Sequence, residues 1–325
     1  MIFYLLAVVL GFALLVWSAD RFVDGAASTA KHLGMPSLLI GILIVGFGTS
    51  APEMVVSAIA AYEGNPGLAL GNAIGSNIVN IALILGVTAI VSPIMVNSKI
   101  VKKEIPLLLL IVLLTGYLLL DNSLTLFEGV ILLVCFFALI LWSVYTALKS
   151  RGDSLESEMD IELKEHSMSL KLGVIWLVFG LILLIVSSRI LVWGAVGVAV
   201  EFGVSDLIIG LTIVALGTSL PELAASVIAA RKGEHDIAIG NVVGSNMFNL
   251  LAVIGIAVVI APMNNIPLEV LQRDWIIMLL LTIALFAMAY GFKGRDGRIN
   301  KVEGTILILC YIAYNTYLGM SLVNS

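Results

Sequence analysis

Long apolar runs separated by short polar stretches dominate the hydrophobic pattern of this chain. A run of about 20 apolar residues is long enough to cross about 30 Å of hydrocarbon as a helix. We expect ten such helices, at about 2–29, 36–61, 68–91, 104–120, 125–149, 170–200, 205–230, 237–260, 271–291 and 301–321. The pattern therefore predicts an all-α polytopic membrane protein.

The apolar pattern is interrupted twice by the same short sequence, in which a helix breaker precedes a carboxylate. GTSAPE at 48–53 returns 169 residues later as GTSLPE at 217–222. Between 48–81 and 217–250, 17 of 34 positions are identical without a gap, which indicates a duplication.

The duplication predicts the domain organisation. We expect a first five-helix repeat at 1–149, an acidic linker at 150–169 and a second five-helix repeat at 170–325, with the shared motifs at 46–81 and 215–250. Because five is an odd number of spans, the second repeat must enter the membrane in the opposite orientation. The repeats are therefore predicted to be inverted.

Positive charge is unequally distributed over this topology. With the N-terminus outside, 14 of the 17 Lys and Arg residues fall in inner loops, whereas Arg273 is outside and Arg21 and Arg189 lie within spans. The positive-inside rule then predicts a multi-pass protein of the cell (plasma) membrane, with both termini extracytoplasmic and linker 150–169 cytoplasmic.

Composition agrees with this class of protein. Hydrophobic residues make up 60% of the chain and charged residues 12%, which is outside the range of soluble domains. The sequence contains no basic face of the kind that would indicate nucleic-acid binding. Cys135 and Cys310 stand alone in apolar segments and predict neither a disulfide nor a metal site. We expect the lipid bilayer as surroundings, no cofactor and no obligate protein partner.

Two acidic residues fall near the middle of predicted spans. A carboxylate there costs about 2.5 to 3.5 kcal/mol, so Glu53 and Glu222 are functional candidates. Pro52 and Pro221 each remove a helical hydrogen bond, and we expect both helices to break at the motif. The competing explanations are neutralisation by a buried base and a proline kink that serves only packing. The motif-bearing spans contain no Lys or Arg between their ends.

The following spans add hydroxyl and amide groups. Ser76 and Asn80 are four residues apart, as are Ser245 and Asn249, so each pair shares a helix face. Hydrogen bonding between helices is the alternative role for them. Together with the acids they form an oxygen set that suits Ca²⁺, Mg²⁺, Mn²⁺ or Na⁺. Two ionised glutamates balance the charge of one divalent or two monovalent ions. Binding of Ca²⁺ and binding of Na⁺ should therefore exclude each other, which is what exchange requires.

Other polar residues within spans are given structural roles. Asn77 and Asn246 are interpreted as packing groups or as supports for the ligands. Asp20 is expected to pair with a nearby cation, such as Arg189 if the first and sixth spans meet.

The motifs GTSAPE with GNAIGSNIVN, and GTSLPE with GNVVGSNMFN, resemble the two alpha repeats of the cation/calcium exchanger superfamily, and most closely its prokaryotic sodium/calcium exchanger branch. The resemblance covers nearly the whole chain. It implies Na⁺-driven Ca²⁺ antiport by alternating access, in which the first and sixth spans slide over a core of motif-bearing spans.

The resemblance also implies the residues of a mid-membrane ion site. The implied groups are the carboxylates of Glu53 and Glu222 with the carbonyls of Thr49 and Thr218 for Ca²⁺, and the hydroxyls of Thr49, Ser50, Ser76, Thr218, Ser219 and Ser245 with the carbonyls of Gly46 and Ala215 for Na⁺. Asn80 fits the family pattern. Asn249 stands where several members carry Asp, which leaves the ion stoichiometry open.

Several alternatives stay open. The same fold could couple Ca²⁺, or another divalent cation, to H⁺ or K⁺, although the second acid typical of proton exchangers is missing from both copies. A passive cation channel is possible on these residues. An intramembrane enzyme is disfavoured, because no nucleophile, His or phosphate loop accompanies the acids and their surroundings are nearly identical.

Overall fold

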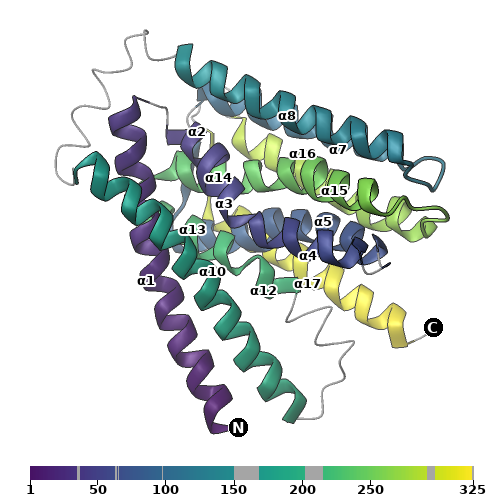
Figure 1. Ribbon diagram of the computed structural model, residues 1–325, viewed down its shortest axis with the longest axis horizontal. Helices are drawn as coiled ribbons and strands as arrows, with labels where there is room; N and C mark the ends of the chain where they lie inside the picture. The colour runs from purple at the N-terminus through teal and green to yellow at the C-terminus, as the bar shows by residue number, and fades with distance from the viewer. Residues whose placement is uncertain are drawn as a thin grey trace. The chain divides into compact units, whose positions relative to one another are not determined.

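The computed structural model describes residues 1–34, 37–62, 64, 66–96, 98–149, 168–201, 215–290 and 297–323, most of which are helical (Figure 1). The α-helices are α1 (Ile2–Leu33), α2 (Ser37–Ile40), α3 (Phe47–Thr49), α4 (Ala51–Tyr62), α5 (Pro66–Ile78), α6 (Leu85–Val91), α7 (Ser98–Leu118), α8 (Leu126–Lys149), α10 (Leu170–Glu201), α12 (Ala215–Thr218), α13 (Leu220–Arg231), α14 (His235–Phe248), α15 (Ile254–Ile260), α16 (Ile276–Ala289) and α17 (Lys301–Val323). Four π-helical segments, η1 (Gly41–Gly46), η2 (Val79–Ile84), η5 (Asn249–Val253) and η6 (Val270–Trp275), and two short strands, β1 (Ile94–Val96) and β2 (Gly297–Ile299), complete the described elements.

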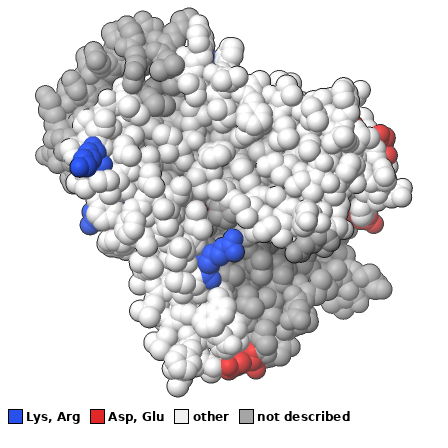
Figure 2. Space-filling model, in the orientation of Figure 1, with Lys and Arg blue, Asp and Glu red and all other residues white. Residues whose placement is uncertain are grey.

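The helical membrane class predicted from the hydrophobic pattern is confirmed. Six helices of the described part are long and apolar enough to cross a membrane, or seven when Gly41–Thr49 and Glu53–Tyr62 count as one interrupted span. The count of ten spans stays a prediction. Large apolar side chains such as Phe3 and Phe127 are exposed, and Figure 2 shows few charged side chains on the visible face. Such a surface suits lipid rather than water.

The described residues form two compact units, and each unit draws on both halves of the chain. Unit 1 comprises Met1–Pro52 and Cys135–Gly244, and unit 2 comprises Glu53–Val134 and Ser245–Ser325. Of the predicted linker 150–169, only residues 168 and 169 lie within the described part.

Unit 1 is built around the packing of α1 against α10, which run side by side in Figure 1. A Cβ atom at Gly11 would lie 2.9 Å from the backbone nitrogen of Leu191, and one at Gly180 would lie 2.9 Å from the Cα atom of Phe22. Glycine thus permits the close approach of the two helices. Gly180 and Leu191 are the residues 169 positions after Gly11 and Phe22, so the two contacts are one contact repeated with the partners exchanged.

This reciprocity reveals how the two helices run. Gly25 meets Leu177, and its equivalent Gly194 meets Val8, so the start of each helix contacts the end of the other. Ser18 and Ser187, which are also 169 residues apart, meet each other with their hydroxyl oxygens 3.5 Å apart. A contact between equivalent residues lies on a two-fold axis. The helices α1 and α10 are therefore antiparallel and related by an internal pseudo-two-fold axis.

Unit 2 contains a short strand pair and close helix contacts. β1 and β2 pair antiparallel, with Ile94 opposite Ile299, and α17 begins directly after β2. A Cβ atom at Gly86 of α6 would lie 3.0 Å from the carbonyl oxygen of Gly304 in α17, so these helices pack backbone to backbone. The π-helical segments η2 and η5, which occupy equivalent positions in the two motifs, were not predicted from the sequence.

The close approach of α1 and α10 makes a stability prediction. In Gly25→Ala, the new methyl group would lie 2.8 Å from the carbonyl oxygen of Gly173 and closer still to Leu177. We expect the resulting overpacking to cost about 1 to 3 kcal/mol, measured by thermal unfolding of the purified protein in detergent.

Gly319→Ala is the matched control, because nothing lies within 4 Å of the position its Cβ atom would occupy on α17. We expect this change to be neutral or stabilising by up to about 1 kcal/mol, through the better helix propensity of alanine. Equal melting temperatures for the two variants would contradict the packing described here.

Candidate functional site

Both GTS-x-PE motifs interrupt their helices at the same position, as predicted. α3 ends at Thr49 and α4 begins at Ala51, while α12 ends at Thr218 and α13 begins at Leu220. The serine between them, Ser50 or Ser219, has a ψ angle close to 0° (−1° and 7°), which departs from helical geometry. The proline after each break then occupies the first turn of the next helix, where its missing N–H group costs nothing.

In unit 1 the first motif contacts the acid of the second. The hydroxyl of Ser50 donates a hydrogen bond of 3.2 Å to Oε1 of Glu222, which is only 1% exposed. Oε2 of Glu222 and the hydroxyl of Ser219 are buried without a hydrogen-bond partner among the described residues. Within this part of the chain Glu222 also forms no ion pair with a Lys or Arg. Among the described residues, no buried base therefore neutralises this acid.

Asn241 hydrogen bonds to Thr49, Glu222 and Ser226. It was not assigned to the site from the sequence. Its Nδ2 atom donates to the carbonyl oxygen of Glu222 at 3.1 Å and to the hydroxyl of Ser226 at 2.8 Å. Its Oδ1 atom lies 3.1 Å from the hydroxyl of Thr49, which can donate to it. Asn241 thus fixes the backbone that carries the acid and the hydroxyl of the other motif.

A sequence signal for this role does exist. Ser57 and Asn72 are the residues 169 positions before Ser226 and Asn241, and all four are among the identical positions of the duplication. The same contact forms in unit 2, where Nδ2 of Asn72 donates to the hydroxyl of Ser57 at 3.1 Å. A polar pair that the duplication keeps at fixed spacing could have been recognised as one hydrogen bond present in each copy.

Unit 2 buries the second acid together with the hydroxyl and amide candidates. Glu53 is 1% exposed, and Ser76 and Ser245 are also buried. The amide oxygens of Asn80 and Asn249 are buried without a hydrogen-bond partner among the described residues. Asn77 and Asn246 are interpreted from the sequence as packing or supporting groups. In the structure, Asn246 accepts a hydrogen bond from Asn80, and Asn77 accepts one from Asn249.

The remaining predicted ligands are Gly46, Thr218 and Ala215. The carbonyl of Gly46 accepts the backbone N–H of Ser50 at 3.1 Å, Thr218 is half-buried, and Ala215 begins α12. No group of three or more His, Cys, Asp or Glu that could hold a metal occurs in the described ranges.

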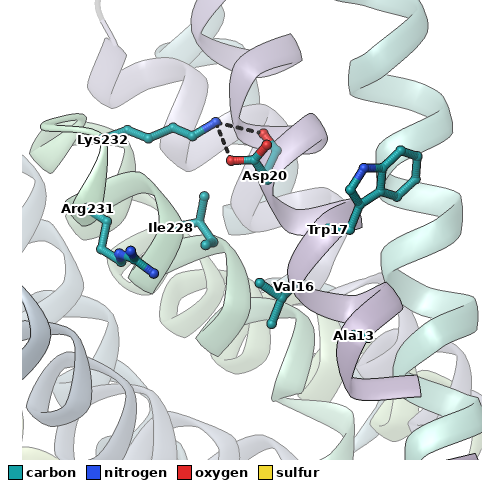
Figure 3. A pocket seen from close by; sticks show the side chains of 7 residues that line it. All are labelled: Ala13, Val16, Trp17, Asp20, Ile228, Arg231 and Lys232. Atoms are coloured by element: carbon teal, nitrogen blue, oxygen red, sulfur yellow. Dashed lines mark hydrogen bonds and ion pairs between the residues drawn. The ribbon is translucent and has the colours of Figure 1, made fainter. Parts of the chain in front are cut away.

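Asp20 pairs with a nearby cation, as expected, but this cation is Lys232 and not Arg189. The spans that carry Asp20 and Arg189 do meet, as α1 and α10, but Oδ1 of Asp20 lies 2.7 Å from the ammonium of Lys232 (Figure 3). The same ammonium also binds Asp24 at 2.7 Å. Lys232 follows α13 directly, so its long side chain reaches α1 beside a groove of about 450 Å³. Arg189 instead lines a separate groove with Trp193.

Long apolar helices, a duplicated helix break and a carboxylate buried in each copy are features of membrane transporters for cations. The sequence profile of the family described as sodium/calcium exchanger protein matches residues 3–145 and 172–320. The chain belongs to this family. It is a multi-pass membrane cation antiporter and not an enzyme.

Relatives of the chain agree over almost its whole length. It is 48% identical over 316 residues to CaxA, a proposed antiporter of Alkalimonas amylolytica, covering 97% of this chain and 98% of that protein. It is 39% identical to the inner membrane protein YrbG of Escherichia coli, covering 89% and 90%. A structure of the sodium-calcium exchanger NCX_Mj soaked with Na⁺ and Ca²⁺ is similar with a TM-score of 0.83 at 30% identity, covering 97% and 98%.

The contacts of Asn241 predict that Asn241→Leu destabilises the protein. This change removes the partner of the buried Ser226 hydroxyl, whereas the Thr49 hydroxyl keeps the carbonyl of Val45 at 3.0 Å. A buried group left unpaired costs about 1 to 3 kcal/mol. Thermal unfolding in detergent measures the loss. Asn315→Leu on α17 is the control, since its half-buried amide makes one bond to the carbonyl of Tyr311 within its own helix, and we expect less than about 1 kcal/mol. A smaller effect at Asn241 than at Asn315 would contradict the role assigned to Asn241.

Proposed function

We propose that the protein exchanges Na⁺ for Ca²⁺ across the cell membrane by alternating access at a site that contains Glu53 and Glu222. The observation that carries this proposal is the environment of Glu222. Its carboxylate is buried, accepts a hydrogen bond from Ser50 of the other motif and keeps one oxygen unpaired in the described structure. A buried carboxylate without a basic partner is costly, and a bound cation would relieve that cost.

The proposed ligand set consists of oxygen atoms. It comprises the side chains of Glu53, Glu222, Thr49, Ser50, Ser76, Asn80, Thr218, Ser219, Ser245 and Asn249, with the carbonyls of Gly46 and Ala215. Ca²⁺ accepts six to eight such oxygens in flexible geometry, and the helix breaks at Ser50 and Ser219 supply irregular backbone beside the acids. The choice of ions is supported by NCX_Mj and by MaX1 of Methanosarcina acetivorans, which is 28% identical to this chain over 353 residues; both are named as exchangers of sodium and calcium.

Charge balance gives the coupling. Two ionised glutamates neutralise one Ca²⁺ or two Na⁺, so occupation by one cation species lowers the affinity for the other. An antiporter requires this competition, because the protein must return across the membrane loaded with the counter-ion. Asn249 is neutral in this chain, so the proposed site has two acids and no third.

The proposed topology has ten spans in two inverted repeats, 1–149 and 170–325, with linker 150–169 in the cytoplasm and both termini outside. The antiparallel, reciprocal packing of α1 and α10 supports inversion. In a background with Cys135 and Cys310 replaced by serine, we expect Ser325→Cys to react with an impermeant maleimide in intact cells. Ser157→Cys should react only after permeabilisation, and the opposite pattern would refute the orientation.

Flux in proteoliposomes tests the proposed exchange. We expect vesicles loaded with Na⁺ to accumulate radioactive Ca²⁺ when diluted into Na⁺-free medium. An imposed pH gradient without Na⁺ should drive no uptake, because the proposed site couples Ca²⁺ to Na⁺. Uptake driven only by the pH gradient would show that the counter-ion is H⁺.

Carboxamide variants provide the control for this flux. Glu53→Gln and Glu222→Gln each remove one negative charge while keeping side-chain size, so we expect both to abolish exchange and retain a folded protein in detergent. Exchange at the wild-type rate in both variants would refute the carboxylate site. Uptake that continues without any trans cation would indicate a channel.

A further inference from the structure

Four asparagines of unit 2 form a reciprocal hydrogen-bonded set. Nδ2 of Asn80 donates to Oδ1 of Asn246 at 2.9 Å, and Nδ2 of Asn249 donates to Oδ1 of Asn77 at 3.1 Å. Asn246 and Asn249 are the residues 169 positions after Asn77 and Asn80, so the two bonds are one bond repeated with the partners exchanged. Position 77 of each copy meets position 80 of the other, and the two segments therefore run antiparallel here.

The orientation of Asn77 is set by a second pair of contacts. Its Nδ2 atom donates to the backbone carbonyl of Asn246 at 3.2 Å and faces the sulfur of Met278 at 3.5 Å. The opposite end of this amide, Oδ1, is therefore the end presented to Asn249. Only a side chain that donates a hydrogen bond fits opposite that oxygen, so an asparagine satisfies position 249 and an ionised aspartate does not.

The same bonds determine where the oxygens of Asn80 and Asn249 lie. Each of these amides has its nitrogen tied to an asparagine of the other copy, so its oxygen cannot rotate into that contact. Both oxygens are buried and have no hydrogen-bond partner among the described residues. A buried amide oxygen left unpaired costs free energy, and it is an accepted ligand type for hard cations.

We propose that Asn77 and Asn246 are positioning residues for cation binding. They hold the nitrogens of Asn249 and Asn80 and thereby present two neutral oxygens to the transported cation. The inference rests on the proposed function, because the cation is the one that Glu53 and Glu222 would bind. It also explains why position 249 is neutral: the fixed oxygen of Asn77 requires a donor there.

Two substitutions at Asn246 test this role. Asn246→Asp keeps the acceptor for Asn80, and the nitrogen that it removes has no hydrogen-bond partner in the described structure. Asn246→Leu removes the acceptor at similar volume. We expect the leucine variant to weaken Ca²⁺ binding by about 10-fold to 100-fold, the range for loss of a residue that orients a metal ligand, and the aspartate variant to bind at least as tightly as wild type.

A role in packing alone predicts the opposite order, because leucine suits apolar surroundings and a buried carboxylate does not. The readout is the Kd for Ca²⁺ of the purified full-length protein by calorimetry in Na⁺-free buffer, with the melting temperature in chelator as the measure of folding. If Asn246→Leu does not fold, Asn246→Ala replaces it in the comparison, because alanine also removes the acceptor for Asn80.

The outcomes separate this inference from the proposed function. Tighter binding by the aspartate variant than by the leucine variant supports the positioning role. Equal affinities, or tighter binding by the leucine variant, in a background where the wild-type protein binds Ca²⁺ would overturn the inference alone. Absence of Ca²⁺ binding by the wild-type protein would refute the proposed function and the inference with it.

Discussion

The buried carboxylate is the constraint on which the structure depends. Removing an ionised carboxyl group from water costs several kcal/mol unless a positive charge and hydrogen bonds replace the lost hydration. Glu222 receives one hydrogen bond from Ser50, and the described residues offer it no Lys or Arg. In the proposed function, the transported cation supplies this positive charge.

Duplication provides a second acid at the equivalent position of the other motif, and several contacts within each unit follow the same symmetry. In unit 1, Ser18 meets Ser187 across the pair of α1 and α10, and in unit 2, Asn77 and Asn246 exchange equivalent roles. In each case the two contacting segments run antiparallel, as expected for repeats of opposite orientation. Equivalent halves give the two membrane faces equivalent access, and we regard this as the physical basis of the proposed alternating exchange.

The sequence predicted those features that depend on local chemistry. The proline in each GTS-x-PE motif predicted the helix breaks at Ser50 and Ser219, and the length of the apolar runs predicted helices such as α1 and α10. Contacts between side chains of different helices could not be predicted from the sequence in this way. Whether Asp20 pairs with Arg189 or with Lys232 depends on how far a long side chain reaches across two helices. The π-helical segments likewise gave no local signal, because a π-helical turn differs from an α-helical one in backbone hydrogen bonding rather than in composition.

The position of the bound ion tests the central claim most directly. Anomalous diffraction from crystals soaked in Ca²⁺ would locate it relative to Glu53 and Glu222. The account predicts one Ca²⁺ with oxygens of both carboxylates about 2.3 to 2.6 Å away. A Ca²⁺ bound by only one of these carboxylates, or by neither, would contradict it.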